Sequence, residues 1–214
     1  MSRFKPAFRD CSGAFRELRR DVREYGIKVY TGDVAGTASS RTDSLILSHF
    51  VSPTAVGFYR LACLLTTPML ALSRALSTTM FSRFTDATQI SPKVFAANAG
   101  WLGVCLGGLV TVGEPLVQFL LGSKYASVIE LVWIVALSAF FAGLAQPVNR
   151  FLGARGQGTY LRTIALSITG CNLVLTFTLI PLWGVEGACY ASAASSLINL
   201  LLHYHYYRRT QRGR

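Results

Sequence analysis

Long uncharged stretches, in which apolar residues do not alternate with polar ones, organise the second half of the chain. Four stretches carry no formal charge, residues 94–113, 131–149, 163–185 and 187–207, and they contain 20, 19, 23 and 21 residues. About 20 residues of α-helix cross a hydrocarbon core of roughly 30 Å, where each backbone polar group needs a partner within its own helix. Each stretch is therefore predicted to be a membrane-spanning helix.

Two earlier stretches, residues 29–50 and 54–81, are also long and apolar, but polar and charged residues interrupt them. With them the chain has six predicted spans, and the absence of strand alternation disfavours a barrel. The expected fold class is all-α, a polytopic membrane protein with six transmembrane helices. Pro68 is predicted to bend the second span, because proline lacks an amide hydrogen. Gly103 with Gly107, and the small residues of the sixth span, predict close helix contact.

An amphipathic pattern precedes the spans. The apolar residues recur at steps of four and three, at Phe4, Phe8, Cys11, Phe15, Leu18, Val22 and Tyr25. Four arginines, Arg16, Arg19, Arg20 and Arg23, flank this stripe. Such a helix can lie on the cytoplasmic leaflet or pack on a larger protein, and the period alone favours neither. The domain boundaries are accordingly 1–28 for a basic amphipathic cytoplasmic helix, 29–207 for the membrane bundle and 208–214 for a basic cytoplasmic tail.

Charge and composition limit the classes of protein to which the chain can belong. Of the 214 residues 51% are hydrophobic and only 14% are charged, against about 25% charged in a soluble domain. The net charge of +11 lies in clusters between apolar stretches, unlike the continuous basic surface of a nucleic-acid-binding protein. This pattern disfavours disorder, nucleic-acid binding and a soluble enzyme. The positive-inside rule places both termini in the cytoplasm.

Little in the sequence points to catalysis or metal binding. The five cysteines are scattered without a CxxC pair, and His203 and His205 stand among tyrosines and arginines where the last span ends. Cysteines inside spans act as small apolar residues, and these histidines are typical of an interfacial anchor. No group of carboxylates or of nucleophile and base indicates an active site. We therefore expect no enzyme activity, no metal and no cofactor.

The first two spans carry polar faces. In the second, Arg60, Cys63, Thr67, Ala71, Arg74 and Thr78 follow steps of three and four. In the first, Asp33, Thr37, Ser40, Arg41, Ser44 and Ser48 share an arc of about 100°, and Asp43 lies beside it. Arginine in hydrocarbon is costly, so such side chains face a bundle interior or a wet cavity.

Two interpretations of these faces stay open. One is a hydrophilic pathway for an anionic solute, because guanidinium groups match phosphate and carboxylate. The other is internal ion pairing of Asp43 or Asp33 with Arg41 or Arg74. Arg41, Arg60 and Arg74 outnumber Asp33 and Asp43, which favours the pathway, although Arg60 could instead extend to the membrane interface.

Several segments in a fixed order resemble a known family. They are YGIKVYTG at residues 25–32, RTDSLIL at 41–47, VGFY at 56–59, GSKYA at 122–126, and Asn172 followed by IPLWGVEGA at 180–188. Their order and spacing are similar to the second lobe of polysaccharide flippases in the MOP superfamily (multidrug, oligosaccharidyl-lipid, polysaccharide exporters). The resemblance covers roughly residues 24–207.

The resemblance implies one lobe of a carrier in the bacterial inner membrane. Such carriers move an anionic lipid-linked oligosaccharide of the polyprenyl pyrophosphate type to the outer leaflet, for O-antigen or exopolysaccharide assembly, by alternating access between two lobes. By this resemblance Arg41, Arg60 and Arg74 would bind the head group, and Asp43 and Asp33 would pair with arginine or couple an ion. Members carry two lobes, so the implied partners are a second lobe or a homodimer, besides membrane lipids. A drug or metabolite antiporter lobe, or a non-transporting remnant or assembly factor, are the alternatives.

Overall fold

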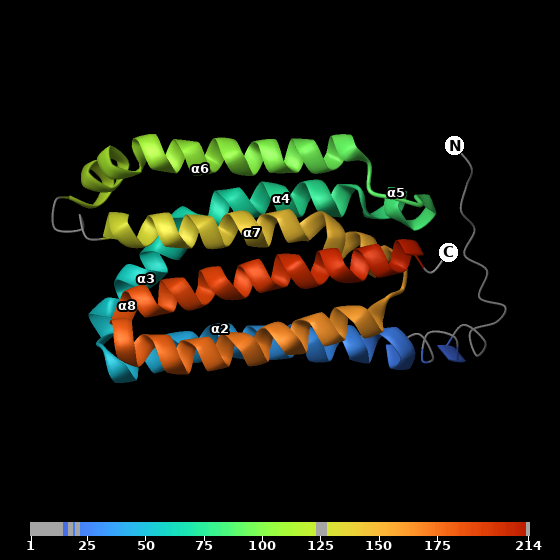
Figure 1. Ribbon diagram of the computed structural model, residues 1–214, viewed down its shortest axis with the longest axis horizontal. Helices are drawn as coiled ribbons and strands as arrows, with labels where there is room; N and C mark the ends of the chain where they lie inside the picture. Colours follow the sequence, from blue (N-terminus) through green and yellow to red (C-terminus); the bar gives the residue numbers. More distant parts are fainter. Residues whose placement is uncertain (1–14, 17–18, 20–21, 123–127, 213–214) are drawn as a thin grey trace.

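A computed structural model describes residues 15–16, 19, 22–122 and 128–212, and every regular element among them is a helix. The elements are η1 (Val22–Gly26, a π-helix), α2 (Ile27–Phe50), α3 (Pro53–Leu65), α4 (Thr67–Thr79), α5 (Phe81–Asp86), α6 (Pro92–Leu121), α7 (Val128–Ala154) and α8 (Gly158–Arg212). The long helices run side by side along one axis (Figure 1). Most of the amphipathic stripe at residues 4–25 lies outside the described residues.

Helices α3 and α4 form one bent unit. Ser52 caps α3, because its hydroxyl accepts a hydrogen bond from the amide of Ala55 at 3.1 Å, and Pro53 stands in the first turn. The two helices meet at Thr66 with a bend of 44°, and Pro68 occupies the first turn of α4. The bend predicted at Pro68 is thus confirmed.

Helix α8 is two antiparallel legs, residues 158–183 and 185–212, rather than one rod (Figure 1). Gly184 turns the chain with φ 56° and ψ −127°, a conformation that glycine adopts far more readily than other residues. A Cβ on Gly187 would lie 2.1 Å from the carbonyl oxygen of Leu179, so this position also requires glycine. The legs then pack together, and Ser195 of the second leg bonds Asn172 of the first at 2.9 Å.

Three helices are long and apolar enough to cross a membrane: Pro92–Pro115, Val128–Ala154 and Gly158–Arg212. The bent pair Pro53–Leu65 and Thr67–Thr79 passes the same test as one unit, which makes four. The expectation of an all-α, multi-pass membrane protein is confirmed. The count of six crossings, which needs α2 and separate legs of α8, stays a prediction.

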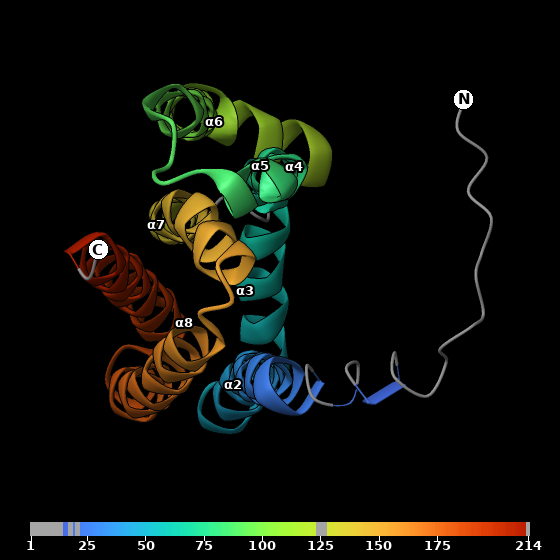
Figure 2. The same ribbon diagram turned by 90° about the vertical axis from the view of Figure 1, so that its right-hand side faces the viewer.

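Helix α7 forms the centre of the bundle. In the most apolar 18-residue stretch of α7, half of the residues are buried inside the protein. The corresponding share is 11% in α6 and 17% in α8. Viewed end-on, α7 lies between α6, α4 and α8 (Figure 2). Helix α6 therefore sits at an edge, with one side against α4 and α7 and the rest exposed.

The glycines of α6 do not serve the close contact that their spacing predicts. A Cβ on Gly103 or Gly107 would meet no atom within 4 Å, because this face of α6 points away from α4 and α7. That prediction is wrong within the described part of the chain. The matching prediction for the sixth span is confirmed, since Gly187, Ala188 and Ala191 are buried.

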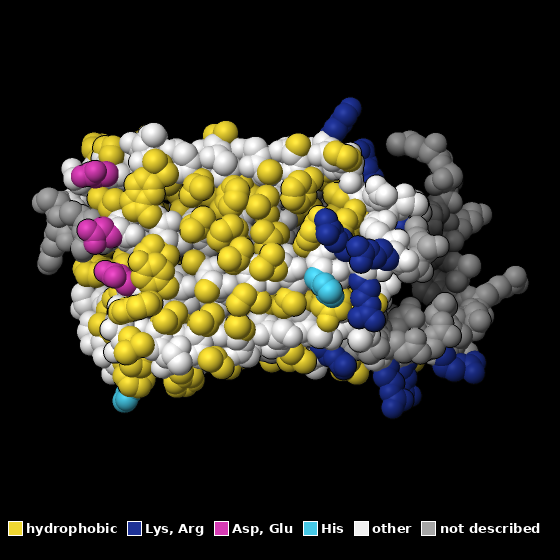
Figure 3. Space-filling view, in the orientation of Figure 1, with side chains coloured by type: hydrophobic (Ala, Val, Ile, Leu, Met, Phe, Trp, Pro, Cys, Tyr) yellow, Lys and Arg dark blue, Asp and Glu magenta, His cyan; other side chains and the backbone are white. Residues whose placement is uncertain are grey.

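On the face that Figure 3 shows, the described charged side chains gather at the two ends of the bundle. Lys and Arg gather where α7 ends and α8 begins and ends, and we call this the basic end: Lys93, Arg150, Arg155, Arg162, Arg208, Arg209 and Arg212. Glu114, Glu130 and Glu186 lie at the opposite end. The belt between the two ends is mostly apolar, as a bilayer requires.

Candidate functional site

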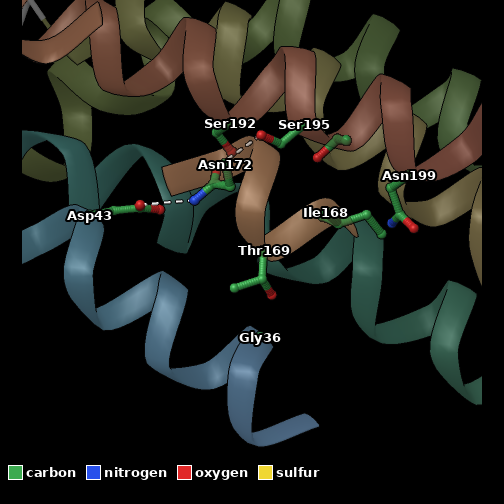
Figure 4. Close-up of a pocket in the computed structure, with 9 residues that line it drawn as sticks. Gly36, Asp43, Ile168, Thr169, Asn172, Ser192, Ser195 and Asn199 are labelled. Atoms are coloured by element: carbon green, nitrogen blue, oxygen red, sulfur yellow. Dashed lines mark hydrogen bonds between the residues drawn. The ribbon is translucent and has the colours of Figure 1, made fainter. Parts of the chain in front are cut away.

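Asp43 is the carboxylate around which a polar site forms. It projects from α2 toward the first leg of α8 (Figure 4). Its Oδ1 accepts hydrogen bonds from Asn172 Nδ2 at 2.9 Å and from Thr176 Oγ1 at 3.0 Å. Asn172 and Thr176 are one turn apart, so both reach the same oxygen. The site thereby joins α2 to α8.

Hydroxyl groups extend this network into the second leg of α8 and into α7. The Oδ1 atom of Asn172 accepts from Ser195 Oγ at 2.9 Å, which fixes the orientation of the amide. Ser138 of α7 lies 2.9 Å from the hydroxyls of both Ser192 and Ser196. Polar side chains thus link four helical segments, which are α2, the two legs of α8, and α7.

A pocket with a volume of about 180 Å³ lies along this network, partly open to the surroundings rather than enclosed. Its lining consists of Gly36, Asp43, Ile168, Thr169, Asn172, Ser192, Ser195, Ser196 and Asn199. The described lining residues supply one carboxylate together with amide and hydroxyl oxygens, and none of them is lysine or arginine. Oxygen-rich surroundings of this kind suit water or a small hard cation and repel an anion.

Arg60 is the predicted site arginine nearest to this pocket. One of its Nη atoms donates a hydrogen bond to the hydroxyl of Ser44, which holds α3 against α2. Its guanidinium also interacts electrostatically with Asp43. The rest of the side chain is exposed. The structure therefore brings Arg60 near Asp43, a pairing that the sequence analysis does not name.

Arg74 lies on α4, beyond the bend, and its side chain is exposed. It shares the outer face of the α3–α4 unit with Arg60 and with Thr67, Ala71 and Thr78, which are exposed as well. We call these five residues the arginine face. Cys63, which the spacing places on the same face, is half-buried against the core. An arginine face cannot lie in lipid without a large cost, so it needs water or a partner surface.

Asp33 and Arg41 both belong to α2, but their side chains lie outside what the structure describes. Their proposed roles stay predictions. For Asp43, the described hydrogen bonds come from Asn172 and Thr176 rather than from Arg74.

The polar faces predicted from the sequence do not include Asn172, Thr176 and Ser195. Their signal was present: Asn172 and Thr176 stand one turn apart within the uncharged stretch 163–185. They are buried polar residues in an apolar helix, with at most 9% of each exposed. Uncharged polar residues at this spacing in a span predict an interhelical hydrogen bond.

Fold and site together define a multi-pass, all-helical membrane protein with a polar pocket inside the bundle and an arginine face outside it. The chain is similar to the protein named "Probable low-salt glycan biosynthesis flippase Agl15" of Haloferax volcanii, with 23% identity over 217 residues. The match covers 94% of this chain and 43% of that protein, so the chain spans less than half of the relative's length. No family model and no solved structure matches the chain.

Proposed function

We propose that the chain is one lobe of a flippase that moves a lipid-linked glycan precursor across a membrane. The observation that carries the proposal is the arginine face, where Arg60 and Arg74 are exposed on a bent helix that belongs to an apolar bundle. The similarity to a glycan biosynthesis flippase supports the same class of protein.

The chemistry of the arginine face suits an anionic head group. A guanidinium offers paired N–H donors that match phosphate oxygens and stays charged at membrane depth. Arg60, Arg74 and Arg41 are proposed to bind the pyrophosphate of a polyprenyl-linked oligosaccharide. The lipid tail of such a substrate would remain in the bilayer while the polar head follows this face.

The proposed topology has six crossings: α2, the bent α3–α4 unit, α6, α7 and the two legs of α8. An even number of crossings places both termini on one side, and the positive-inside rule makes the basic end cytoplasmic. In a bacterium the membrane would be the inner membrane. The amphipathic residues 1–28 would then rest on the cytoplasmic leaflet or on a neighbouring part of the transporter.

A second lobe completes the proposed transporter. One lobe supplies a single wall for the substrate, and the relative is more than twice the length of the matched region. We propose that a second lobe, or a second copy of this chain, faces the arginine face and encloses it. Alternating access would come from tilting of the two lobes against each other, for which the bend between α3 and α4 is a suitable hinge.

Asp43 is proposed to couple transport to a cation. The described lining of its pocket offers one acid and several neutral oxygens, so it differs in chemistry from the arginine face. Arg60 belongs to the arginine face and interacts with both Ser44 and Asp43. It therefore links the arginine face directly to the pocket. Asp33 is a second candidate on the same helix.

Complementation tests the proposal. In a flippase-deleted strain that the wild-type chain restores, with a second lobe co-expressed if one is needed, Arg74→Ala, Arg60→Ala and Arg41→Ala are expected to abolish complementation at unchanged abundance in the membrane. Arg209→Ala removes an exposed arginine of the basic end and serves as the matched control. Full complementation by all three variants of the arginine set would reject a cationic substrate pathway.

A further inference from the structure

A column of polar residues continues from the pocket along the second leg of α8. Its members are Ser192, Ser195, Ser196, Asn199 and His203. At 100° per residue they fall within an arc of about 100°, so they share one face of the helix. The first four line the pocket around Asp43, and His203 lies one turn farther along. In Figure 4, Asp43 and Asn199 stand at opposite sides of the pocket.

His203 ends the column in a closed hydrogen-bonded pair. Its side chain is only 4% exposed. The Nδ1 atom lies 2.9 Å from the carbonyl oxygen of Asn199, and Nε2 lies 3.1 Å from Asn149 Nδ2 of α7. A carbonyl only accepts, so Nδ1 carries the hydrogen and Nε2 accepts from Asn149. This neutral ring satisfies both contacts and seals the α7–α8 contact below the pocket.

An unpaired acceptor marks the space between His203 and Asp43. The Oδ1 atom of Asn199 is buried and has no hydrogen-bond partner among the residues that the structure describes. A buried acceptor without a donor is costly, and water is the usual donor in such a place. The cavity of about 180 Å³ holds several molecules at ~30 Å³ each. Its serines and Asp43 offer the further partners that ordered water needs.

The column points to the basic end. Beyond His203 the helix continues to Arg208 and Arg209, and Asn149 directly precedes Arg150. The pair of His203 and Asn149 therefore lies between the pocket and the surface of the basic end. Toward the opposite end, the described part of this leg has no similar row of polar residues. Its buried residues there are Gly187, Ala188 and Ala191.

We propose that the pocket at Asp43 is filled with water and exchanges with the basic end through this column, which the His203–Asn149 pair closes. The passage gives Asp43 a route for water and small cations to one side of the membrane; its use in coupling rests on the proposed flippase function. His203 acts as the gate because loss of its ring opens the contact with α7 below Asn199.

Cysteine accessibility tests the passage without any transport assay. In a chain whose five native cysteines are alanine, Ser196→Cys places a thiol in the column and Leu197→Cys places one on the next, apolar face. With the protein in sealed vesicles, 2-(trimethylammonium)ethyl methanethiosulfonate, whose fixed charge keeps it from crossing the bilayer, is added from one side at a time. Arg209→Cys reports which side holds the basic end. We expect Ser196→Cys to react from that side only, and Leu197→Cys to stay unreactive.

The gate is tested in the same vesicles. His203→Ala is expected to raise the rate of Ser196→Cys modification severalfold, whereas His205→Ala, which removes an exposed ring two residues away, leaves it unchanged. His203→Gln keeps a hydrogen-bonding side chain and is expected to react nearly as slowly as the parent, which guards against an effect of misfolding. An unreactive Ser196→Cys, reaction from the opposite side, or a rate indifferent to His203→Ala would overturn the proposal. The labelling result holds whether or not the chain flips lipid, so failure of the passage and failure of the flippase function are distinguishable.

Discussion

Pro147 leaves the carbonyl oxygen of Gly143 without its helical hydrogen bond, because proline has no amide hydrogen to donate to the residue four positions earlier. That oxygen accepts instead from Ser73 Oγ at 2.9 Å and from Asn98 Nδ2 at 3.1 Å. A Cβ on Gly143 would lie 2.7 Å from the side chain of Leu102, so the glycine also lets α6 approach. Helices α4, α6 and α7 therefore meet at one carbonyl.

Loss of both donors to this carbonyl is expected to be worse than the sum of the single losses. Ser73→Ala or Asn98→Leu leaves one donor in place and should cost about 0.5–1 kcal/mol, the usual range for a hydrogen bond between membrane helices. The double variant strands a buried carbonyl and should cost about 1–2 kcal/mol beyond the sum. Unfolding in mixed micelles measures these values. Thr111→Ala, at an exposed hydroxyl bonded within its own helix, is the control, and strictly additive costs would contradict the shared acceptor.

Variants of Asp43 and of its partner Asn172 are expected to affect transport and stability separately. Asp43→Asn keeps the Oδ1 acceptor for Asn172 and Thr176, so the free energy of unfolding should change by less than about 1 kcal/mol. The same variant removes the charge that the proposed cation coupling requires, so transport should fall to background. Asn172→Leu has the opposite profile, since it breaks the contact between α2 and α8 and should cost about 1–2 kcal/mol. Thermal unfolding and complementation, measured on the same preparations, check the pair; wild-type transport by Asp43→Asn would refute the coupling role.

The helices could be predicted from the sequence because the membrane imposes one dominant rule. Uncharged stretches 94–113 and 131–149 correspond to α6 (Pro92–Leu121) and α7 (Val128–Ala154), and each helix extends past the charged residues that bound its stretch. The expected division between residues 185 and 187 lies one to three residues beyond the turn at Gly184. The charge of Glu186 predicts a division between the two stretches at that residue. The backbone instead reverses at Gly184, where glycine permits the turn.

The polar site could be predicted only in part, because composition along one helix does not reveal which helix faces it. Asp43 lies 129 positions from Asn172, and no local spacing connects them. The small residues show the same difficulty. Gly187 and Gly103 look alike in sequence, yet one contacts the backbone of Leu179 and the other meets no atom of the described chain.

Alanine substitutions of Gly187 and Gly103 are expected to have opposite effects on stability. Gly187→Ala puts a Cβ into a carbonyl group that cannot move without opening the two legs of α8, so the variant is expected to lose several kcal/mol or fail to accumulate. Gly103→Ala adds a methyl to open space and replaces a poor helix former, so stability should stay equal or rise by up to about 1 kcal/mol. Membrane abundance and thermal unfolding of the two variants provide the comparison. Equal effects would show that the turn at Gly184 does not hold the legs as described.

A partner for the arginine face should be detectable directly. Arg60 and Arg74 are exposed at membrane depth, and a lone bundle would leave them against lipid at a cost of a few kcal/mol each. If the partner is a second copy, two differently labelled copies in one liposome are therefore expected to show energy transfer. If it is a different lobe, the transfer is expected between a labelled copy of this chain and a labelled second lobe. Dilution with excess lipid should not abolish the signal of a specific pair. A chain that stays monomeric in liposomes and still moves lipid-linked sugar would show that one lobe suffices, because its arginine face would then work without an opposite wall.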